Sequence, residues 1–322
     1  PPKPRRVHVL RLFGTRLAMT IPLLLVVSFL IYSLIVLVPG DPAVALAGQN
    51  PTPDQIEAVR EKLGFNDPFL TQYWHWLTNA FHGDLGKSLF TGENVWTSII
   101  GRLPVTLSLT FLSLLLAAIL GVALGLVAGL RPGSWIDRLA TIGASVGVAL
   151  PYFWVGMILV LLFAINNPIL PATSYVALTD NPIEWFKHLI IPALSLAIAP
   201  MAVIARQTRA SVATVMTEDY IRTADAKGLS RRRVIAKHAL KNAAVPVVTV
   251  FGIEANRLIG GTVVIEQLFV LPGLGQLAYQ SVFARDFPMV QGVLLFTAAL
   301  ILLINLIVDV SYGYFNPRIR KA

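Results

Sequence analysis

Two segments carry glycines at spacings that suggest nucleotide binding, and neither completes its motif. Residues 83–88 (GDLGKS) have two residues between their glycines, whereas a Walker A loop has four. Residues 273–278 (GLGQLA) follow an apolar stretch, but no βαβ unit with an acidic residue about 20 positions further on accompanies them, as a dinucleotide fingerprint requires. We therefore expect no nucleotide site in this chain.

The other polar residue types predict neither a catalytic nor a metal centre. The chain has no cysteine, which excludes thiolate nucleophiles, disulfides, iron–sulfur clusters and cysteine-ligated zinc. The histidines show neither ligand spacing nor a serine–histidine–aspartate arrangement; they are His8, His75, His82, His188 and His238. We expect a protein that is not an enzyme and that holds no cofactor or metal of its own.

One charged pair lies within a largely apolar segment, residues 246–269. Glu254 and Arg257 are three positions apart, so they can pair on one face of a helix. If such an apolar segment crosses a membrane, charges near its middle are costly, and they should face the interior of a helix bundle or a water-filled path. The pair is therefore a candidate for the translocation pathway, or alternatively a self-neutralised pair that fixes helix rotation or a subunit contact.

Long runs without charge indicate a membrane protein. Of the 322 residues, 55% are hydrophobic and 13% are charged, about half the charged share of a soluble domain. Four uncharged runs exceed the ~20 residues that a membrane-spanning helix needs, and they occupy 17–40, 103–130, 139–179 and 287–308. The shorter run 188–205 and the segment 246–269 bring the expected number of spans to six. The first run is too long for a signal peptide, so we expect an uncleaved anchor.

These runs predict an all-α membrane protein with six transmembrane helices. Because Asn166, Asn167 and Pro168 interrupt the long third run, its helix should end near residue 165. The expected segments are a basic cytoplasmic N-terminus (1–16), membrane helices at 17–38, 104–130, 139–165, 189–210, 246–266 and 290–312, extracytoplasmic loops at 39–103, 166–188 and 267–289, a cytoplasmic loop at 211–245 and a cytoplasmic tail (313–322).

The distribution of charge orients these spans. The net charge of +9 divides into +15 in the expected cytoplasmic segments, −4 in the alternate loops and −2 within the membrane segments. Short loops rich in lysine and arginine stay in the cytoplasm. Both termini should therefore be cytoplasmic, and the basic charge gives no reason to expect a nucleic-acid partner.

The large first loop should contain helical structure. Thr52, Pro53 and Asp54 begin a helical pattern that runs to Leu63 and ends at Gly64. An amphipathic aromatic stretch follows, which we expect at the membrane surface or over the end of the bundle; it contains Tyr73, Trp74, Trp76 and Phe81.

Glycines four positions apart predict close helix packing. Gly121, Gly125 and Gly129 share one face of the second span, where the absence of side chains lets two backbones approach. Their partner is either another helix of this chain or a helix of a second membrane subunit.

The cytoplasmic segment 219–233 combines a short helical pattern with a break and a basic continuation. The break falls at Gly228-Leu229-Ser230, where Ser230 can cap the helix that follows. Such a segment suits docking into a groove of another protein. It equally suits a basic interfacial helix held by anionic lipid.

The same segment resembles the cytoplasmic coupling loop of ABC importer permeases. The general pattern of that family has Glu-Ala-Ala, three further residues and glycine; this chain has Arg222-Thr223-Ala224 before Gly228, and Pro246 follows later than in the general pattern. Both departures resemble the dipeptide/oligopeptide branch. Further segments similar to that branch, its B-type permease above all, are 39–42 (PGDP), 102–107 (RLPVTL), 151–154 (PYFW), 260–266 (GGTVVIE), 272–275 (PGLG) and 316–320 (NPRIR).

The resemblance implies a type I ABC importer permease fold, and it implies import of di- and oligopeptides at a bacterial inner membrane. It also implies a second six-helix permease, two ATPase subunits or domains that bind ATP and magnesium, and an extracytoplasmic substrate-binding protein. The residues that it assigns to coupling with the ATPases are Tyr220, Arg222, Thr223, Ala224, Asp225, Ala226, Lys227, Gly228, Leu229, Ser230, Arg231 and Arg232. Two alternatives stay open: the same scaffold importing nickel complexes, glutathione or haem, and a stand-alone gradient-driven secondary transporter.

Overall fold

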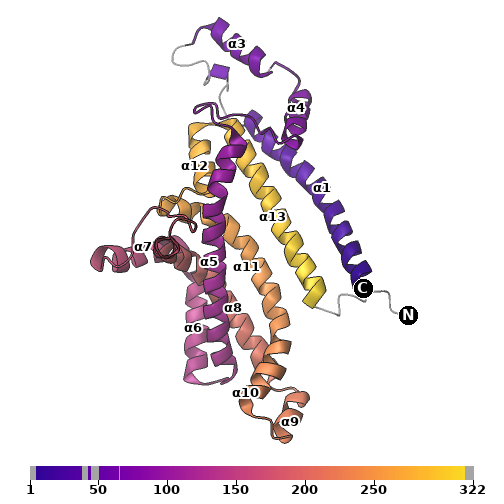
Figure 1. The fold of residues 1–322 in the computed structure, drawn as a ribbon, viewed down its shortest axis with the longest axis vertical. Coiled ribbons are helices and arrows are strands. Elements are labelled where there is room, and N and C mark those ends of the chain that lie inside the picture. The colour runs from indigo at the N-terminus through magenta and orange to yellow at the C-terminus, as the bar shows by residue number, and fades with distance from the viewer. Residues whose placement is uncertain (1–4, 38–42, 45–50, 65, 316–322) are drawn as a thin grey trace. The chain divides into compact units, whose positions relative to one another are not determined.

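The computed structural model describes residues 5–37, 43–44, 51–64 and 66–315. The segments 39–42 and 316–320, which resemble the dipeptide/oligopeptide branch, lie outside the described residues. The helices of the described part are α1 (Arg5–Leu37), α3 (Pro53–Leu63), α4 (Phe69–Phe81), α5 (Val95–Gly129), α6 (Trp135–Ala149), α7 (Tyr152–Val160), the π-helical η1 (Leu161–Asn166), α8 (Pro182–Val215), α9 (Asp219–Ala226), α10 (Arg231–Arg233), the π-helical η2 (Val234–Ala239), α11 (Leu240–Leu268), α12 (Leu274–Ala284) and α13 (Phe287–Phe315) (Figure 1).

Several of these helices have the length and composition of membrane spans. They are α5, α8, the Pro246–Leu268 part of α11 and the Phe287–Val308 part of α13. The helices α6 and α7–η1 pass the same test as a pair, which makes a fifth span if they form one. In α1 the apolar segment is the shorter Ala18–Ser33. The structure therefore supports four or five spans by length and composition, and the sixth stays an expectation.

The third expected span differs from the prediction. In place of one helix over 139–165, α6 and the α7–η1 segment are bent by 101° relative to each other. The break falls at Leu150, which has an extended backbone (ψ 130°) and precedes Pro151. Proline disfavours helical geometry in the residue before it and lacks an N–H for the helical hydrogen bond. The prolines within α8, Pro192 and Pro200, leave that helix continuous.

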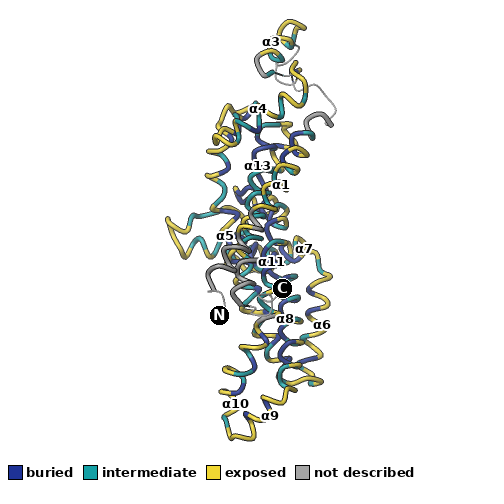
Figure 2. Tube along the Cα trace, turned by 90° about the vertical axis from the view of Figure 1, so that its right-hand side faces the viewer, coloured by how far each residue is buried: buried dark blue, intermediate teal, exposed yellow. Residues whose placement is uncertain are grey.

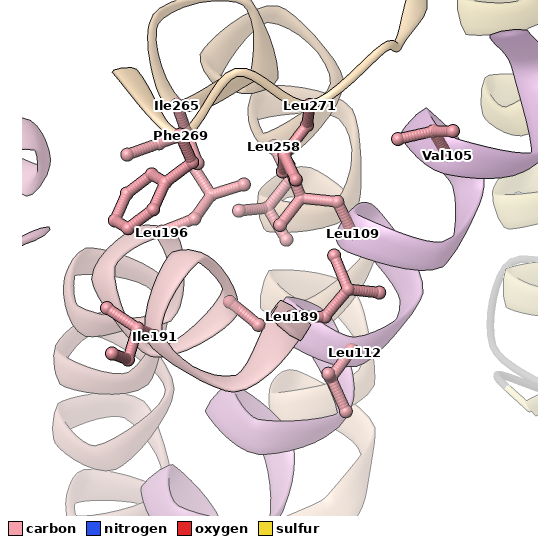
Figure 3. Close-up of a cluster of buried hydrophobic side chains, with 11 residues drawn as sticks. Val105, Leu109, Leu112, Leu189, Ile191, Leu196, Leu258, Ile265, Phe269 and Leu271 are labelled. Carbon is pink, nitrogen blue, oxygen red and sulfur yellow. The ribbon is translucent and has the colours of Figure 1, made fainter. Parts of the chain in front are cut away.

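The described residues form two compact units, and the first contains Pro104–Gln276 together with residues 5–13 and 303–315. In this unit α8 packs against α6, α7 and α11. Side chains of α5, α8 and α11 meet in an apolar cluster (Figure 3), formed by Val105, Leu109, Leu112, Leu189, Ile191, Ala193, Leu196, Leu258, Ile265, Phe269 and Leu271. Lipid tails are as apolar as these side chains, so close van der Waals packing stabilises such a cluster in a membrane.

The second unit contains Gly14–Leu103 and Leu277–Leu302. Thr52 caps α3 in a reciprocal capping box with Gln55, and Gly64 ends the helix in the left-handed conformation (φ 68°), as the sequence predicts. The aromatic stretch forms α4, whose inner face packs on α1 through Tyr73 and Trp76 against Tyr32. Two further aromatic side chains of α4 are exposed, Trp74 at 62% and Phe81 at 75%.

Candidate functional site

The cytoplasmic segment is built on a small apolar cluster of its own. Buried Ile221 and Ala224 of α9 contact buried Val234 and Ala239 of η2, and Val215, Met216 and Leu229 pack around them. Gly228 lies between the two helices in the left-handed conformation (φ 73°), with open space where a side chain would be. Glycine adopts this conformation without steric cost, so the chain reverses direction here. The segment is thereby attached to the ends of both α8 and η2–α11.

The outer face of this segment is exposed (Figure 2). Of the residues assigned to coupling, Ala224 is buried and Leu229 half-buried in the segment's own cluster. The others are exposed: Tyr220, Arg222, Thr223, Asp225, Ala226, Lys227, Gly228, Ser230, Arg231 and Arg232. This leaves an exposed, largely basic surface on an apolar cluster.

Local hydrogen bonds position part of that surface. The Asn242 side chain of α11 donates to the Tyr220 hydroxyl at 3.0 Å, and the Thr223 hydroxyl donates to the Asp219 carbonyl at 2.9 Å. Arg222 and Asp219 pair at 3.4 Å, but both are exposed, so their pair contributes little stability. Ser230 occupies the N-cap position of α10 without a side-chain capping bond, contrary to the prediction. Its backbone carbonyl accepts from Arg233 and Val234 instead.

A bidentate ion pair that sequence reasoning missed connects α6 to α8. Arg209 donates from Nε to Asp137 Oδ1 at 2.6 Å and from Nη2 to Oδ2 at 2.7 Å. The Gly133 N–H donates to the same carboxylate at 2.9 Å. The available signal was that Asp137 is the single acid in the basic 131–138 loop. The pair fixes the end of α8 that leads into the coupling segment.

We expect Asp137→Ala to lower the free energy of unfolding by about 2–3 kcal/mol. Removing one member of a fully buried pair costs about 3–5 kcal/mol, and the Arg209 side chain is 37% exposed, which reduces that value. The measurement is thermal unfolding of the purified protein in detergent. The matched control is Asp225→Ala, which removes an exposed carboxylate; an equal loss in both variants would show that the ion pair contributes nothing specific.

The three predicted packing glycines lie against α8 of the same chain. A Cβ on Gly121 would stand 2.8 Å from the Met201 carbonyl oxygen, and one on Gly129 would stand 2.8 Å from that of Arg209. At Gly125 it would stand 2.6 Å from Thr208 Cβ. All three separations are closer than a Cβ tolerates, so the backbones of α5 and α8 touch along three turns.

The charged pair within α11 has one buried and one exposed member. Arg257 Nη1 donates to Glu254 Oε1 at 3.0 Å; the Glu254 side chain is 4% exposed and that of Arg257 is 69% exposed. One position away, Asn256 donates from Nδ2 to Asn305 Oδ1 of α13 at 2.6 Å. The middle of this apolar helix therefore has polar contacts toward α13 and an outward-facing guanidinium.

The glycine segment at 273–278 surrounds a carboxylate of this chain. Glu266 is fully buried and accepts from the Thr106 hydroxyl at 2.7 Å and from the Gln276 N–H at 3.0 Å. The Thr106 oxygen accepts from the Leu274 N–H at 2.8 Å. A Cβ on Gly273 would overlap the Glu266 carboxylate, so these glycines serve close packing at the start of α12. Sequence reasoning placed Glu266 only near a span end.

In the other glycine segment, residues 83–88, backbone N–H groups also donate to acceptors of this chain. The Gly86 N–H donates to Asp84 Oδ1 and the Ser88 N–H to the Glu93 carbonyl. The Ser88 hydroxyl donates to buried Asp286, which begins the turn before α13. These two N–H groups therefore donate to oxygens of the chain itself.

Helices of membrane-spanning length around an apolar core, with an exposed basic segment on one loop, define a protein with several membrane spans. The chain matches the family model described as "Binding-protein-dependent transport system inner membrane component" over residues 121–321 and the N-terminal model of such components over residues 9–110. The chain belongs to this family of binding-protein-dependent inner-membrane transport components.

Named relatives cover nearly the whole chain. A Brucella abortus (strain 2308) protein, named as a candidate peptide transport system permease, is 43% identical over 305 residues, which are 95% of this chain and 97% of that protein. The glutathione transport system permease protein GsiC of Escherichia coli (strain K12) is 42% identical over the same shares. Among solved structures, an inward-facing MetNI methionine ABC transporter chain matches with a TM-score of 0.55 at 18% identity, covering 68% of this chain and 96% of that chain. That likeness shows the permease fold.

Proposed function

We propose that this chain is one of two permease subunits of an ATP-driven importer of di- and oligopeptides, and that segment 219–233 couples it to the ATPases. The observation that carries the proposal is the exposed face of α9 to α10, held on the apolar cluster of Ile221, Ala224 and Val234. A docking surface that transmits movement must keep its shape when its partner moves it. This apolar cluster packs the inner side of the segment and so holds its shape.

The arrangement suggests how movement of an ATPase would reach the membrane. The segment continues directly from α8 at one end and into η2 and α11 at the other. The Asp137–Arg209 pair links α8 to α6 near the same end. Displacement of the segment would therefore move these helices together as a rigid body, which can open the bundle alternately to the two sides.

The partners follow from this role. ATP and magnesium would bind in the partner ATPases, because the two nucleotide-like segments of this chain are filled by its own hydrogen bonds. A second permease would complete the pathway, and an extracytoplasmic binding protein would deliver the substrate. We place both termini and the basic loops in the cytoplasm on the basis of their charge.

Two other functions make different predictions. Import of glutathione, nickel complexes or haem would use the same subunits and differ in which solute competes for uptake; the relative GsiC is named for glutathione. A gradient-driven secondary transporter would move solute as the purified chain alone. Co-purification of an ATPase and a second permease with the tagged chain, followed by uptake competition with di-, tri- and longer peptides, separates these three cases.

We expect Gly228→Trp to abolish peptide uptake and substrate-stimulated ATP hydrolysis in the reconstituted complex. The substitution places a bulky group on the proposed docking face. The matched control is Gly92→Trp, because Gly92 also has positive φ (72°) and open surroundings and lies in the expected extracytoplasmic loop, outside the proposed docking face. Backbone strain is then similar in both variants. Unchanged uptake in Gly228→Trp, or equal losses in both, would contradict the coupling role.

A further inference from the structure

One face of α11 that the other described residues leave uncovered carries several polar side chains. Exposed residues recur at intervals of three or four positions along the helix, at Asn242, Pro246, Thr249, Ile253, Arg257, Gly260, Val264 and Gln267. Such intervals place residues on one side of an α-helix. We call these eight residues the α11 stripe. It contains four polar side chains, a proline and a glycine in a helix that is otherwise apolar enough to span a membrane.

The exposed side of α5 has the opposite character. Its exposed positions at similar intervals are all apolar: Pro104, Leu107, Phe111, Leu115, Ile119, Leu124 and Val127. This composition suits contact with lipid tails. Polar and charged side chains inside a membrane instead face protein or a water-filled cavity. The α11 stripe therefore faces something other than lipid.

Arg257 is the centre of the stripe. It lies near the middle of the apolar part Pro246–Leu268, which has 23 residues, and its side chain is 69% exposed. The bond to buried Glu254 occupies one of five guanidinium N–H donors. The donors that remain can bind a carboxylate, which guanidinium groups recognise in a bidentate manner.

The next turn of the stripe leaves the helix surface open. Gly260 lies one turn further along the stripe, and a Cβ there would meet no atom within 4 Å. Buried Glu254 offsets the charge of Arg257, so a passing anion would meet a donor group with little net positive charge. Transport needs binding that is favourable enough to admit the solute and weak enough to release it.

We propose that the α11 stripe lines the aqueous route of the substrate and that Arg257 binds the C-terminal carboxylate of the peptide as it passes. The inference rests on the proposed function, since it assigns the route and a carboxylate contact to a peptide importer. It makes Arg257 a specificity-determining residue and makes Glu254 the residue that positions it.

Cysteine accessibility tests the route, and the native chain contains no cysteine. Thr249→Cys, Gly260→Cys and Val264→Cys on α11 are compared with Leu107→Cys, Phe111→Cys and Leu115→Cys on α5, each in the assembled complex in membrane vesicles. A charged, membrane-impermeant thiosulfonate is added, and labelling of this chain is measured by mass. We expect labelling on α11 and none on α5. No labelling on α11, or equal labelling on both helices, would overturn the aqueous route.

Uptake of trialanine and of its C-terminal amide tests the carboxylate contact. Uptake by Arg257→Gln and Arg257→Lys is divided by wild-type uptake of the same peptide, which cancels the preference of the binding protein. Arg257→Gln should lower trialanine uptake about tenfold or more relative to the amide, with partial recovery in Arg257→Lys. Equal losses for both peptides would overturn the carboxylate contact of Arg257 and leave the aqueous route standing. A wild-type complex that imports neither peptide overturns peptide import and, with it, the carboxylate contact.

Discussion

Gly125→Ala is expected to destabilise this protein, although alanine favours helices more than glycine does. The added Cβ would overlap the Ala205 carbonyl and stand 2.6 Å from Thr208 Cβ, so α5 and α8 would have to separate. Overpacking of this kind costs about 1–3 kcal/mol. The loss is larger in Gly125→Leu, for which we expect almost no folded, monodisperse protein after purification in detergent.

Gly143 provides the control for that experiment. It lies within α6, and a Cβ on it would meet nothing within 4 Å. Gly143→Ala should therefore be neutral or raise the free energy of unfolding by up to about 1 kcal/mol, because glycine is unfavourable inside a helix. Gly125→Ala should lower the thermal midpoint, whereas Gly143→Ala should leave it unchanged or raise it. An equal lowering in both variants would show that the contact between α5 and α8 does not limit the side chain at position 125.

Glu266→Ala should be the second severe variant. It leaves the Thr106 hydroxyl and the Gln276 N–H without their acceptor in a fully buried site. A buried donor without a partner costs about 1–3 kcal/mol, so we expect a loss of about 3 kcal/mol or more in the free energy of unfolding. It also removes a carboxylate from the N-terminus of α12, where negative charge is favourable.

Limited proteolysis and thermal unfolding measure this effect. Cleavage in Glu266→Ala should appear around residues 270–276, because the hydrogen bonds that hold this turn are lost. Glu266→Gln keeps the shape and one acceptor oxygen and should lose less. The control is Glu61→Ala, which removes an exposed carboxylate from α3. Stability of Glu266→Ala equal to that of the control would show that Glu266 does not hold the start of α12.

Much of the candidate site could be predicted from the sequence, because it depends on residues that are close together in the chain. Gly228 and the basic run that follows mark a turn between two short helices, and the structure places the residue in the left-handed conformation that such a turn requires. The pair of Glu254 and Arg257 follows from helical spacing alone. The capping box at Thr52 is equally local, since it involves residues three positions apart.

Contacts between residues far apart in the sequence could not be predicted in this way. Asp137 and Arg209 are 72 positions apart, and Thr106 and Glu266 are 160 apart. A single sequence shows that a buried carboxylate needs donors, yet it does not show which donors come close. The break at Pro151 was not predicted either. A proline by itself does not specify a break, because the prolines at 192 and 200 occupy a helix that continues.

By itself the sequence determined the class of protein, its helical composition, the family to which it belongs and the segment proposed for docking. These depend on hydrophobic run length, charge balance and short-range spacing, which are properties of neighbouring residues. Only the tertiary structure decided that Gly121, Gly125 and Gly129 pack on α8 of the same chain and that Glu266 holds the start of α12. It also decided that Arg257 is exposed while Glu254 is buried. The physical reason is that burial and hydrogen-bond partners arise from how helices pack in three dimensions, and helical periodicity alone does not specify which face meets which neighbour.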